Sequence, residues 1–208
     1  MESCWGLPKQ PPFYFRGATM DELIILIDGG YLDQTLIQQF NRAKIDYQQL
    51  PKKIESMIPS SRILRTYYFH CLPYMDKPPT AEQSERYARR QRFYATLGNF
   101  PRFEVITGTL AKRYNEQGEV YYEQKRVDML LGLRAVHFSA KGRIGHIALL
   151  AGDSDYVPAI KLAKEDGVDI FLFHGDSYHR ELWQYSDVRV KIDQAFIDSR
   201  VGIYFVGN

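Results

Sequence analysis

Residues 146–173 read HIALLAGDSDYVPAIKLAKEDGVDIFLF. The run HIALLAG, residues 146–152, is almost wholly apolar, which is typical of a strand buried on both faces of a sheet. The stretch that follows GDSD predicts a helix ending at Gly167, with Pro158 in a first turn that tolerates proline. VDIFLF, residues 168–173, then supplies another buried strand. This succession of strand, helix and strand predicts a parallel α/β unit.

The rest of the chain continues the same alternation. Apolar runs predict further strands over residues 23–28, 63–70 and 103–110. Apolar residues at helical spacing predict helices over residues 31–40, 46–58, 80–97, 127–139 and 178–185. Residues 111–124, with a turn at Asn115-Glu116-Gln117-Gly118, predict a β-ribbon. We therefore expect a three-layer, Rossmann-like α/β fold with a mainly parallel central sheet and a small protruding ribbon.

The length bounds the domain organisation. A chain of 208 residues is long enough for one substantial domain with a single hydrophobic core. Residues 1–20 contain three prolines among aromatic side chains and predict an irregular leader. We expect the domain itself over residues 21–190 and a C-terminal extension over residues 191–208.

Composition excludes several classes of protein. The two cysteines, Cys4 and Cys71, form neither a CxxC pair nor a zinc pattern. No apolar run reaches the roughly 18 residues that span a bilayer, so we expect a cytoplasmic protein without membrane contact. The formal net charge of +2 does not bear on a nucleic-acid partner, because phosphate binding depends on where the positive charge lies.

Two aspartates follow predicted buried strands. Asp28 ends LIILID and Asp153 ends ALLAGD. Ligands of parallel α/β sheets bind beyond the carboxyl ends of the strands, so both carboxylates are expected to face one cleft. Gly29 and Gly30, in an expected tight turn, would let a phosphate approach the backbone.

Two further aspartates are candidates for the same pocket. Asp155 falls at the expected N-cap of the helix after GDSD, and Asp128 opens the helix after Lys125-Arg126. Each has a plain structural alternative, because aspartate is among the best N-cap residues. A strand-end aspartate is also common in phosphotransferases and nucleotide binders, so spacing alone does not name a reaction.

Clustered carboxylates indicate a metal site. Four such groups repel one another and raise their own pKa values, whereas bound Mg²⁺ or Mn²⁺ relieves that repulsion. Two such ions can activate water and polarise a phosphodiester, which is the chemistry of many nucleases.

The segments IDGGYL, residues 27–32, KRVDMLLGLRAV, residues 125–136, and residues 146–173 resemble the NYN domain family, particularly its LabA-like (DUF88) branch, within the PIN-like nucleases. The resemblance runs from about Leu23 to Phe173, and GDSDYVPAIKLAKEDG is its most specific stretch. It implies a PIN-like fold and a divalent-metal ribonuclease that leaves 5′-phosphate and 3′-hydroxyl ends on its products.

Carried over residue by residue, the family's acidic positions fall on Asp28, Asp128, Asp153 and Asp155. The resemblance thus implies that these four residues hold the metal and form the catalytic centre. One position departs from the pattern, since many NYN proteins have asparagine shortly after IDG where this chain has Tyr31.

Several basic residues are candidates for contacts with single-stranded or structured RNA. Folding of the ribbon is expected to bring Lys112-Arg113 and Lys125-Arg126 together beside Asp128 as a phosphate clamp, and Ser154 can donate to phosphate or serve only as a turn residue. Helix 80–97 mixes four arginines with aromatic residues, but its Glu–Arg pairs at i,i+4 favour an ordinary solvated face. His174 and His179 are loosely spaced and are assigned no role.

Three functions are therefore weighed. A metal-dependent endoribonuclease leads. A catalytically weak RNA-binding or regulatory module is the alternative, because Tyr31 replaces the expected asparagine. A metal phosphatase or nucleotide hydrolase acting on small molecules comes third, because strand-end aspartates also serve those reactions. Neither a dinucleotide-binding motif nor a P-loop motif is present. A homodimer is a further expectation that no sequence pattern supports specifically.

Overall fold

Seven strands form one sheet in the computed structural model, which describes residues 20–197. The sheet has the order β4-β3-β2-β1-β5-β6-β7. The strands are β1 (Asp21–Asp28), β2 (Ser61–Cys71), β3 (Phe103–Tyr114), β4 (Val120–Lys125), β5 (His146–Leu150), β6 (Asp169–His174) and β7 (Val188–Lys191). All neighbours pair in parallel except β3 and β4, which are antiparallel.

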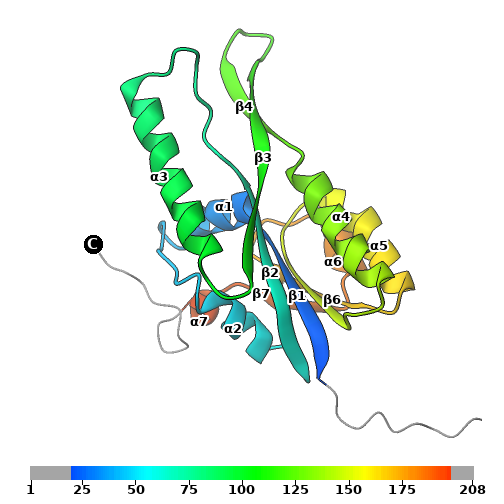
Figure 1. Cartoon of the computed structure of the whole chain (residues 1–208). Coiled ribbons are helices and arrows are strands. Elements are labelled where there is room, and N and C mark those ends of the chain that lie inside the picture. The colour runs from blue at the N-terminus through cyan, green and yellow to red at the C-terminus, as the bar shows by residue number, and fades with distance from the viewer. Residues whose placement is uncertain (1–19, 198–208) are drawn as a thin grey trace, which may run out of the picture.

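Helices cover both faces of this sheet. They are α1 (Gly29–Gln39), α2 (Leu50–Ser56), α3 (Ala81–Gly98), α4 (Val127–Ala140), the 3₁₀ turn η1 (Ser154–Tyr156), α5 (Val157–Glu165), α6 (Arg180–Tyr185) and α7 (Gln194–Ile197). In Figure 1, α1, α2, α3 and α7 lie on one side of the sheet and α4, α5 and α6 on the other. The fold therefore has three layers.

The central strand explains why one sheet serves two cores. Residues 23–27 of β1 are fully buried. Successive side chains of a strand point to opposite faces, so Leu23, Ile25 and Ile27 join the core under α1 and α2, while Ile24 and Leu26 join the core under α4 and α5. A strand buried on both faces must be apolar throughout, as LIILI is.

The order of the strands fixes where a ligand can bind. From β1 the chain runs outward through β2 to β3, and after β4 the helix α4 carries it back to β5 on the other side of β1. The carboxyl ends of β1 and β5 therefore lie side by side where the winding reverses direction, which is the usual place for a ligand site in an open α/β sheet.

The expected fold class is confirmed, with local differences. The helix expected over residues 80–97 is present as α3, and Thr80 and Gln83 form a capping box at its start. The expected tight turn at Gly29-Gly30 is wrong, because Asp28 itself caps α1 and both glycines are already helical. The helix expected over residues 46–58 is shorter, and β3 runs unbroken into the ribbon.

Elements near the C-terminus were not predicted. Residues after Tyr185 form β7, a parallel edge strand, and α7, whose Phe196 and Ile197 are buried in the core. The leader and most of the expected C-terminal extension, residues 1–19 and 198–208, lie outside the described residues.

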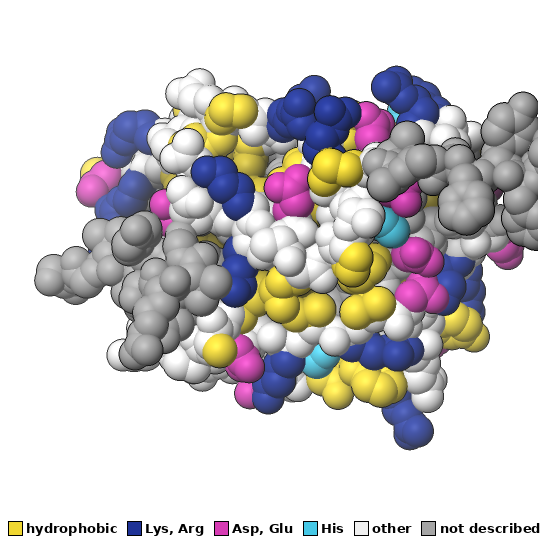
Figure 2. Space-filling model, turned by 90° about the horizontal axis from the view of Figure 1, so that it is seen from below, with side chains coloured by type: hydrophobic (Ala, Val, Ile, Leu, Met, Phe, Trp, Pro, Cys, Tyr) yellow, Lys and Arg dark blue, Asp and Glu magenta, His cyan; other side chains and the backbone are white. Residues whose placement is uncertain are grey.

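The ribbon of β3 and β4 extends beyond the sheet at the carboxyl ends of the parallel strands (Figure 1). The opposite end of the molecule has a mixed surface, where basic, acidic and hydrophobic side chains alternate (Figure 2). Among residues 20–197 no helix is long and apolar enough to cross a membrane.

Candidate active site

A cleft of about 640 Å³ opens at the carboxyl ends of β1 and β5. Its walls come from four separate parts of the chain that the sheet order brings together. They are Asp28, Gly30, Tyr31, Gln34, Gln124, Val127, Asp128, Gly152, Asp153, Ser177, Tyr178 and His179. Three of the four aspartates predicted from the sequence therefore share one cleft.

Asp28 is fixed by its own helix. It is the last residue of β1 and the N-cap of α1, and its Oδ1 accepts a hydrogen bond of 3.0 Å from the backbone N–H of Tyr31. This bond satisfies one of the amides that lack a partner in the first helical turn. The second carboxylate oxygen, Oδ2, faces another part of the chain.

Tyr156 joins two of the aspartates. Its hydroxyl oxygen lies 2.8 Å from Oδ2 of Asp28 and 2.8 Å from Oδ1 of Asp128. These two carboxylate oxygens therefore cannot be farther apart than twice that distance, although Asp28 ends β1 and Asp128 is the second residue of α4. The tyrosine ring is fully buried between them and the core under α4.

The surroundings of Asp28, Asp128 and Tyr156 disfavour the charged forms of Asp28 and Tyr156. Burial raises the pKa of Asp28, and the negative charge of Asp128 adds to the rise, while hydrogen bonds from Tyr31 and Tyr156 oppose it. Burial and the same two carboxylates also raise the pKa of Tyr156, so its hydroxyl stays protonated. The Tyr156 hydroxyl has one proton and can donate it to only one of the two carboxylates at a time. Its contact with the other carboxylate is a hydrogen bond only if Asp28 or Asp128 is protonated.

Asp153 and Asp155 have different surroundings. Asp153 is exposed in the cleft, and its Oδ1 accepts a bond of 3.1 Å from the backbone N–H of Asp155. Its Oδ2 has no hydrogen-bond donor among residues 20–197. The expected N-cap role of Asp155 is wrong, because Asp153 caps η1 and Asp155 lies within it. Asp155 is exposed outside the cleft lining.

Tyr31 braces the floor of the cleft. Its hydroxyl donates to the carbonyl oxygen of Ser177 at 2.6 Å and accepts from the backbone N–H of Gly175 at 2.9 Å. Its ring lies against Gly152, where a Cβ atom would overlap the ring carbons. Tyr31 thus ties α1 to the segments that follow β5 and β6, directly beside Asp153.

Gly152→Ala is expected to destabilise the protein by about 1–3 kcal/mol, the usual cost of overpacking a tight contact. The added methyl group would push the Tyr31 ring aside and break its two hydrogen bonds. Urea unfolding measures the change. Gly98→Ala is the matched control, since a Cβ atom there meets no atom within 4 Å. Equal stability of the two variants would contradict this packing argument.

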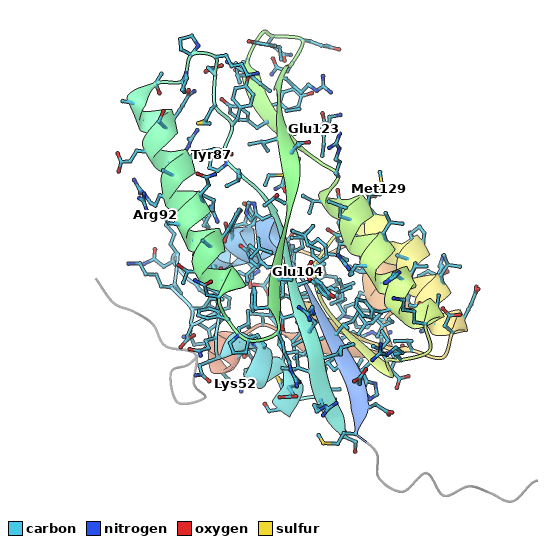
Figure 3. The ribbon with its side chains drawn as sticks, in the orientation of Figure 1. Lys52, Tyr87, Arg92, Glu104, Glu123 and Met129 are labelled. Atoms are coloured by element: carbon cyan, nitrogen blue, oxygen red, sulfur yellow. The ribbon has the colours of Figure 1, made fainter. Side chains whose placement is uncertain are left out.

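The predicted phosphate-binding residues lie outside the cleft lining. Arg113 and Lys125 both contact Glu123, at 3.0 and 3.4 Å, and Figure 3 labels this glutamate on the ribbon. The ribbon register thus brings these two basic residues to one carboxylate. Lys112 instead forms an ion pair of 3.0 Å with Asp76.

The two remaining candidates lie near the cleft aspartates in the chain. Arg126 is exposed at the start of α4 in a left-handed backbone conformation, with φ 74°. Ser154 opens η1 beside Asp153, and its hydroxyl lies 3.4 Å from Oδ1 of that residue.

Sequence reasoning missed several residues of the site. Tyr156 was quoted within GDSDYVP without a role, yet it connects two of the aspartates. Gln124, at the base of the ribbon, reaches over the cleft, since its Nε2 would lie 2.8 Å from a Cβ atom at Gly30. His179, to which no role was assigned, caps α6 and lines the cleft. Its position after the β6 strand end was the available signal.

The aspartates do not form a closed ligand cage. Within residues 20–197, no group of three or more His, Cys, Asp or Glu side chains is close enough together to hold a metal ion. Among the four predicted aspartates, Asp28 and Asp128 share a contact with the hydroxyl of Tyr156. Carboxylate oxygens are nevertheless the ligands that Mg²⁺ prefers, and this ion is usually bound by one or two protein carboxylates with waters and substrate phosphates completing its shell.

The family model described as the NYN domain matches residues 22–193, which includes every strand and helix around the cleft except α7 and the first residue of β1. The chain belongs to the NYN domain family. NYN domains are generally nucleases of the PIN-like group and typically use divalent metals, so the family indicates a hydrolase acting on nucleic acid.

Other comparisons add little to the NYN assignment. The comparison with curated proteins found no match. Among solved structures, MurG of Acinetobacter baumannii is similar over 83% of this chain at 9% identity, with a TM-score of 0.36. This chain covers 42% of the MurG chain. A likeness of that size carries no argument about function.

Proposed function

We propose that this NYN domain is a divalent-metal-dependent endoribonuclease that hydrolyses RNA phosphodiester bonds in the cleft at β1 and β5. Asp28, Asp128 and Asp153 would bind Mg²⁺ or Mn²⁺, and Asp155 would complete the surroundings of the metal. By resemblance to the family, the products would carry 5′-phosphate and 3′-hydroxyl ends.

One observation carries the proposal. The carboxylates of Asp28 and Asp128, a hundred positions apart in the chain, meet at the hydroxyl of Tyr156 within a solvent-accessible cleft. Two acidic side chains at such a distance repel each other, which costs stability. Such an arrangement is expected where a bound cation offsets the repulsion.

The donor set fits a hard divalent cation. Two carboxylates near each other, with an exposed third at Asp153, give oxygen ligands and leave room for water and phosphate. When bound, such an ion polarises the phosphodiester and lowers the pKa of its water. Asp28 is held at the end of β1 as the N-cap of α1, and Asp153 shortly after β5 as the N-cap of η1, so the backbone positions both carboxylates at the cleft.

The other residues of the cleft position these carboxylates. The Tyr31 amide orients Asp28, and Tyr156 keeps Asp28 and Asp128 together. Gln124 and His179 stand at the cleft wall, where their side chains can donate to a bound phosphate. Five residues would bind RNA outside the metal centre: Lys112, Arg113, Lys125, Arg126 and Ser154. Lys112, Arg113 and Lys125 would do so by exchanging their ion pairs with Asp76 or Glu123 for phosphate.

Cleavage of fluorescent single-stranded and hairpin RNA tests the proposal, with a DNA of the same sequence as control. We expect RNA to be cut in Mn²⁺ or Mg²⁺ and not in EDTA, with product ends that a 5′-phosphate-dependent exonuclease degrades. A folded protein that cuts none of these polymers in either metal would overturn it.

Tyr156→Phe is expected to lower the free energy of unfolding by about 1–3 kcal/mol in EDTA, because the half-buried carboxylates of Asp28 and Asp128 lose their shared hydrogen-bond donor. In Mn²⁺ the deficit should shrink, since the cation takes over the role of the hydroxyl proton. Urea unfolding in both buffers measures this. Tyr178→Phe is the matched control, because its hydroxyl forms no hydrogen bond within the described residues; a deficit that Mn²⁺ leaves unchanged would speak against a metal at this pair.

The alternative is a catalytically weak RNA-binding or regulatory module. It is favoured by the absence of a preformed three-ligand group among residues 20–197 and by Tyr31, which serves as a brace where many NYN proteins have asparagine. RNA binding without cleavage in any metal would support it.

Several finer assignments belong to the same proposal. We assign the chain to the LabA-like branch, with a nuclease domain over residues 21–190 between a leader and a C-terminal extension. A cytoplasmic location and a homodimer complete it. Size-exclusion chromatography with light scattering would test the dimer.

A further inference from the structure

A second cavity, of about 710 Å³, lies outside the cleft and is lined almost entirely by arginine. Its lining residues are Arg42, Arg86, Arg89, Arg90 and Phe93. Four guanidinium groups around one hollow repel one another in the absence of an anion. We call these four arginines and Phe93 the arginine pocket.

The α3 part of the arginine pocket comes from one helical face. Arg86, Arg89, Arg90 and Phe93 follow the spacing i, i+3, i+4, i+7, which aligns side chains along one side of a helix. Arg92 lies off this face, and Figure 3 shows it on the outer side of α3. The helix thus carries four arginines but directs only three of them to the pocket.

Arg42 enters the pocket from the end of α1. Asn41 and Arg42 both have a left-handed backbone, with φ 46° and 60°, and the amide of Arg42 donates to the Leu36 carbonyl at 2.9 Å to end the helix. Glycine is the usual residue in this conformation, because side chains crowd the backbone there. The turn that ends α1 thus places Arg42 beside the arginines of α3.

The positive charge of the pocket is only partly neutralised. Arg90 contacts Oδ2 of Asp33 at 3.2 and 3.1 Å through its two terminal nitrogens, and Arg89 pairs with Glu85 at 3.0 Å. Arg42 and Arg86 are exposed and have no carboxylate partner within the described residues. Two free guanidinium groups therefore face an open hollow.

The arginine pocket is connected to the cleft by α1. Asp28 caps the start of this 11-residue helix, Asp33 anchors Arg90 one turn later, and Arg42 follows its end. At about 1.5 Å per residue, the helix spans about 16 Å. With stacked nucleotides about 3.4 Å apart, this distance corresponds to about five nucleotides.

We propose that the arginine pocket binds the phosphate backbone of a single-stranded RNA segment that leaves the cleft, about five nucleotides from the scissile bond. The proposal rests on the RNA substrate of the proposed function. Guanidinium groups match phosphate oxygens with two parallel hydrogen bonds, and Arg90, already fixed by Asp33, gives the pocket a rigid wall.

Binding of labelled RNA to Arg42→Gln/Arg86→Gln tests the pocket, using oligonucleotides of about 4 and about 20 nucleotides in Mg²⁺-free buffer. Each lost phosphate contact makes the negative slope of log K against log salt shallower by about 0.7 for single strands. For the longer RNA we therefore expect the slope of the double variant to be shallower than that of the wild type by about 1.4. If the double variant and the wild type bind equally at about 1 M salt, this difference in slope makes the variant about 25-fold weaker at about 0.1 M salt. The short RNA should bind the variant and the wild type alike.

Arg92→Gln is the control, because it removes one positive charge from α3 outside the arginine pocket, whereas the double variant removes two from within it. A slope for the double variant equal to that of Arg92→Gln would overturn the proposal. So would an equal loss for the short RNA, for free nucleotide or for polyglutamate, which would indicate a general anion site or an acidic protein partner.

The outcomes separate this proposal from the nuclease activity. If long RNA binds through Arg42 and Arg86 but is never cut, the pocket stands and the nuclease proposal fails. If RNA is cut while the double variant binds and cleaves long RNA like Arg92→Gln, the nuclease stands and the pocket fails. If the wild type binds no RNA, both fail.

Discussion

Asp28→Asn and Asp153→Asn are each expected to slow metal-dependent RNA cleavage by about 10³-fold, which corresponds to about 4 kcal/mol of transition-state stabilisation. An amide has the shape of a carboxylate but binds a divalent cation poorly. Asp28 would lose the charge that it shares with Asp128, and Asp153 its exposed ligand oxygen. Single-turnover cleavage of a fluorescent RNA at saturating protein measures the rate.

Two other aspartates calibrate this effect. Asp166→Asn changes an exposed carboxylate at the end of α5, near the amino ends of the strands and away from the cleft, and should leave the rate within about twofold. Asp155→Asn should cost about 10-fold, because Asp155 lies beside the cleft without lining it. Cleavage by Asp28→Asn at a rate similar to that of Asp166→Asn would remove Asp28 from the centre.

Asp28→Asn, which should slow cleavage, is expected to raise the stability of the metal-free protein. In EDTA, Asp28→Asn is expected to be more stable than the wild type by about 1 kcal/mol at neutral pH. The pKa of Asp28 is raised in the folded state, chiefly by burial, so the folded protein holds this proton more tightly than the unfolded chain. Wild-type stability therefore falls as the pH rises above about 4, through the raised pKa, and the amide avoids this loss.

Added Mn²⁺ should reverse that order. A ligand at about 100 times its Kd stabilises the folded state by about 2.7 kcal/mol, and only a protein with the intact carboxylate pair should gain this. Thermal unfolding of the wild type and Asp28→Asn, each in EDTA and in Mn²⁺, measures both effects. A similar Mn²⁺ response in the two proteins would locate the binding elsewhere.

The central strands could be predicted from the sequence because they are buried on both faces of the sheet. A strand covered by helices on both faces must be apolar wherever it is buried, and LIILI of β1 and IALL of β5 satisfy this over a whole run. The edge strand β7 escaped prediction because Val188 to Lys191 are mostly exposed, so VRVK has no such run. Residues 188–191 form a strand because they pair with β6, and this contact cannot be predicted from the local sequence.

The candidate site was predictable to the same extent. Asp28 and Asp153 were found because strand ends adjoin in a parallel sheet, and the structure does bring both to one cleft. Asp155 was mistaken for a cap because N-cap preference does not distinguish two aspartates that are two residues apart. The earlier one, Asp153, has the extended backbone that a cap requires.

The role of Tyr156 could not be read locally. Its contacts with Asp28 and Asp128 are separated by 128 and 28 positions in the chain, and an isolated tyrosine after GDSD is equally suited to core packing. The arginine pocket is a similar case. The i,i+4 pairing of Glu85 with Arg89 is present, as expected for a solvated face, but the approach of Arg42 from α1 depends on the tertiary fold.

The central claim is that Asp28, Asp128 and Asp153 form one metal centre that cleaves RNA. Titration of the protein with Mn²⁺, followed by electron paramagnetic resonance in samples that also contain labelled RNA, tests it most directly. We predict that bound Mn²⁺ and cleaved RNA rise together in the wild type, and that both are lost in Asp28→Asn and Asp153→Asn but retained in Asp166→Asn. Cleavage that persists in EDTA, or Mn²⁺ binding that all three variants retain, would contradict it.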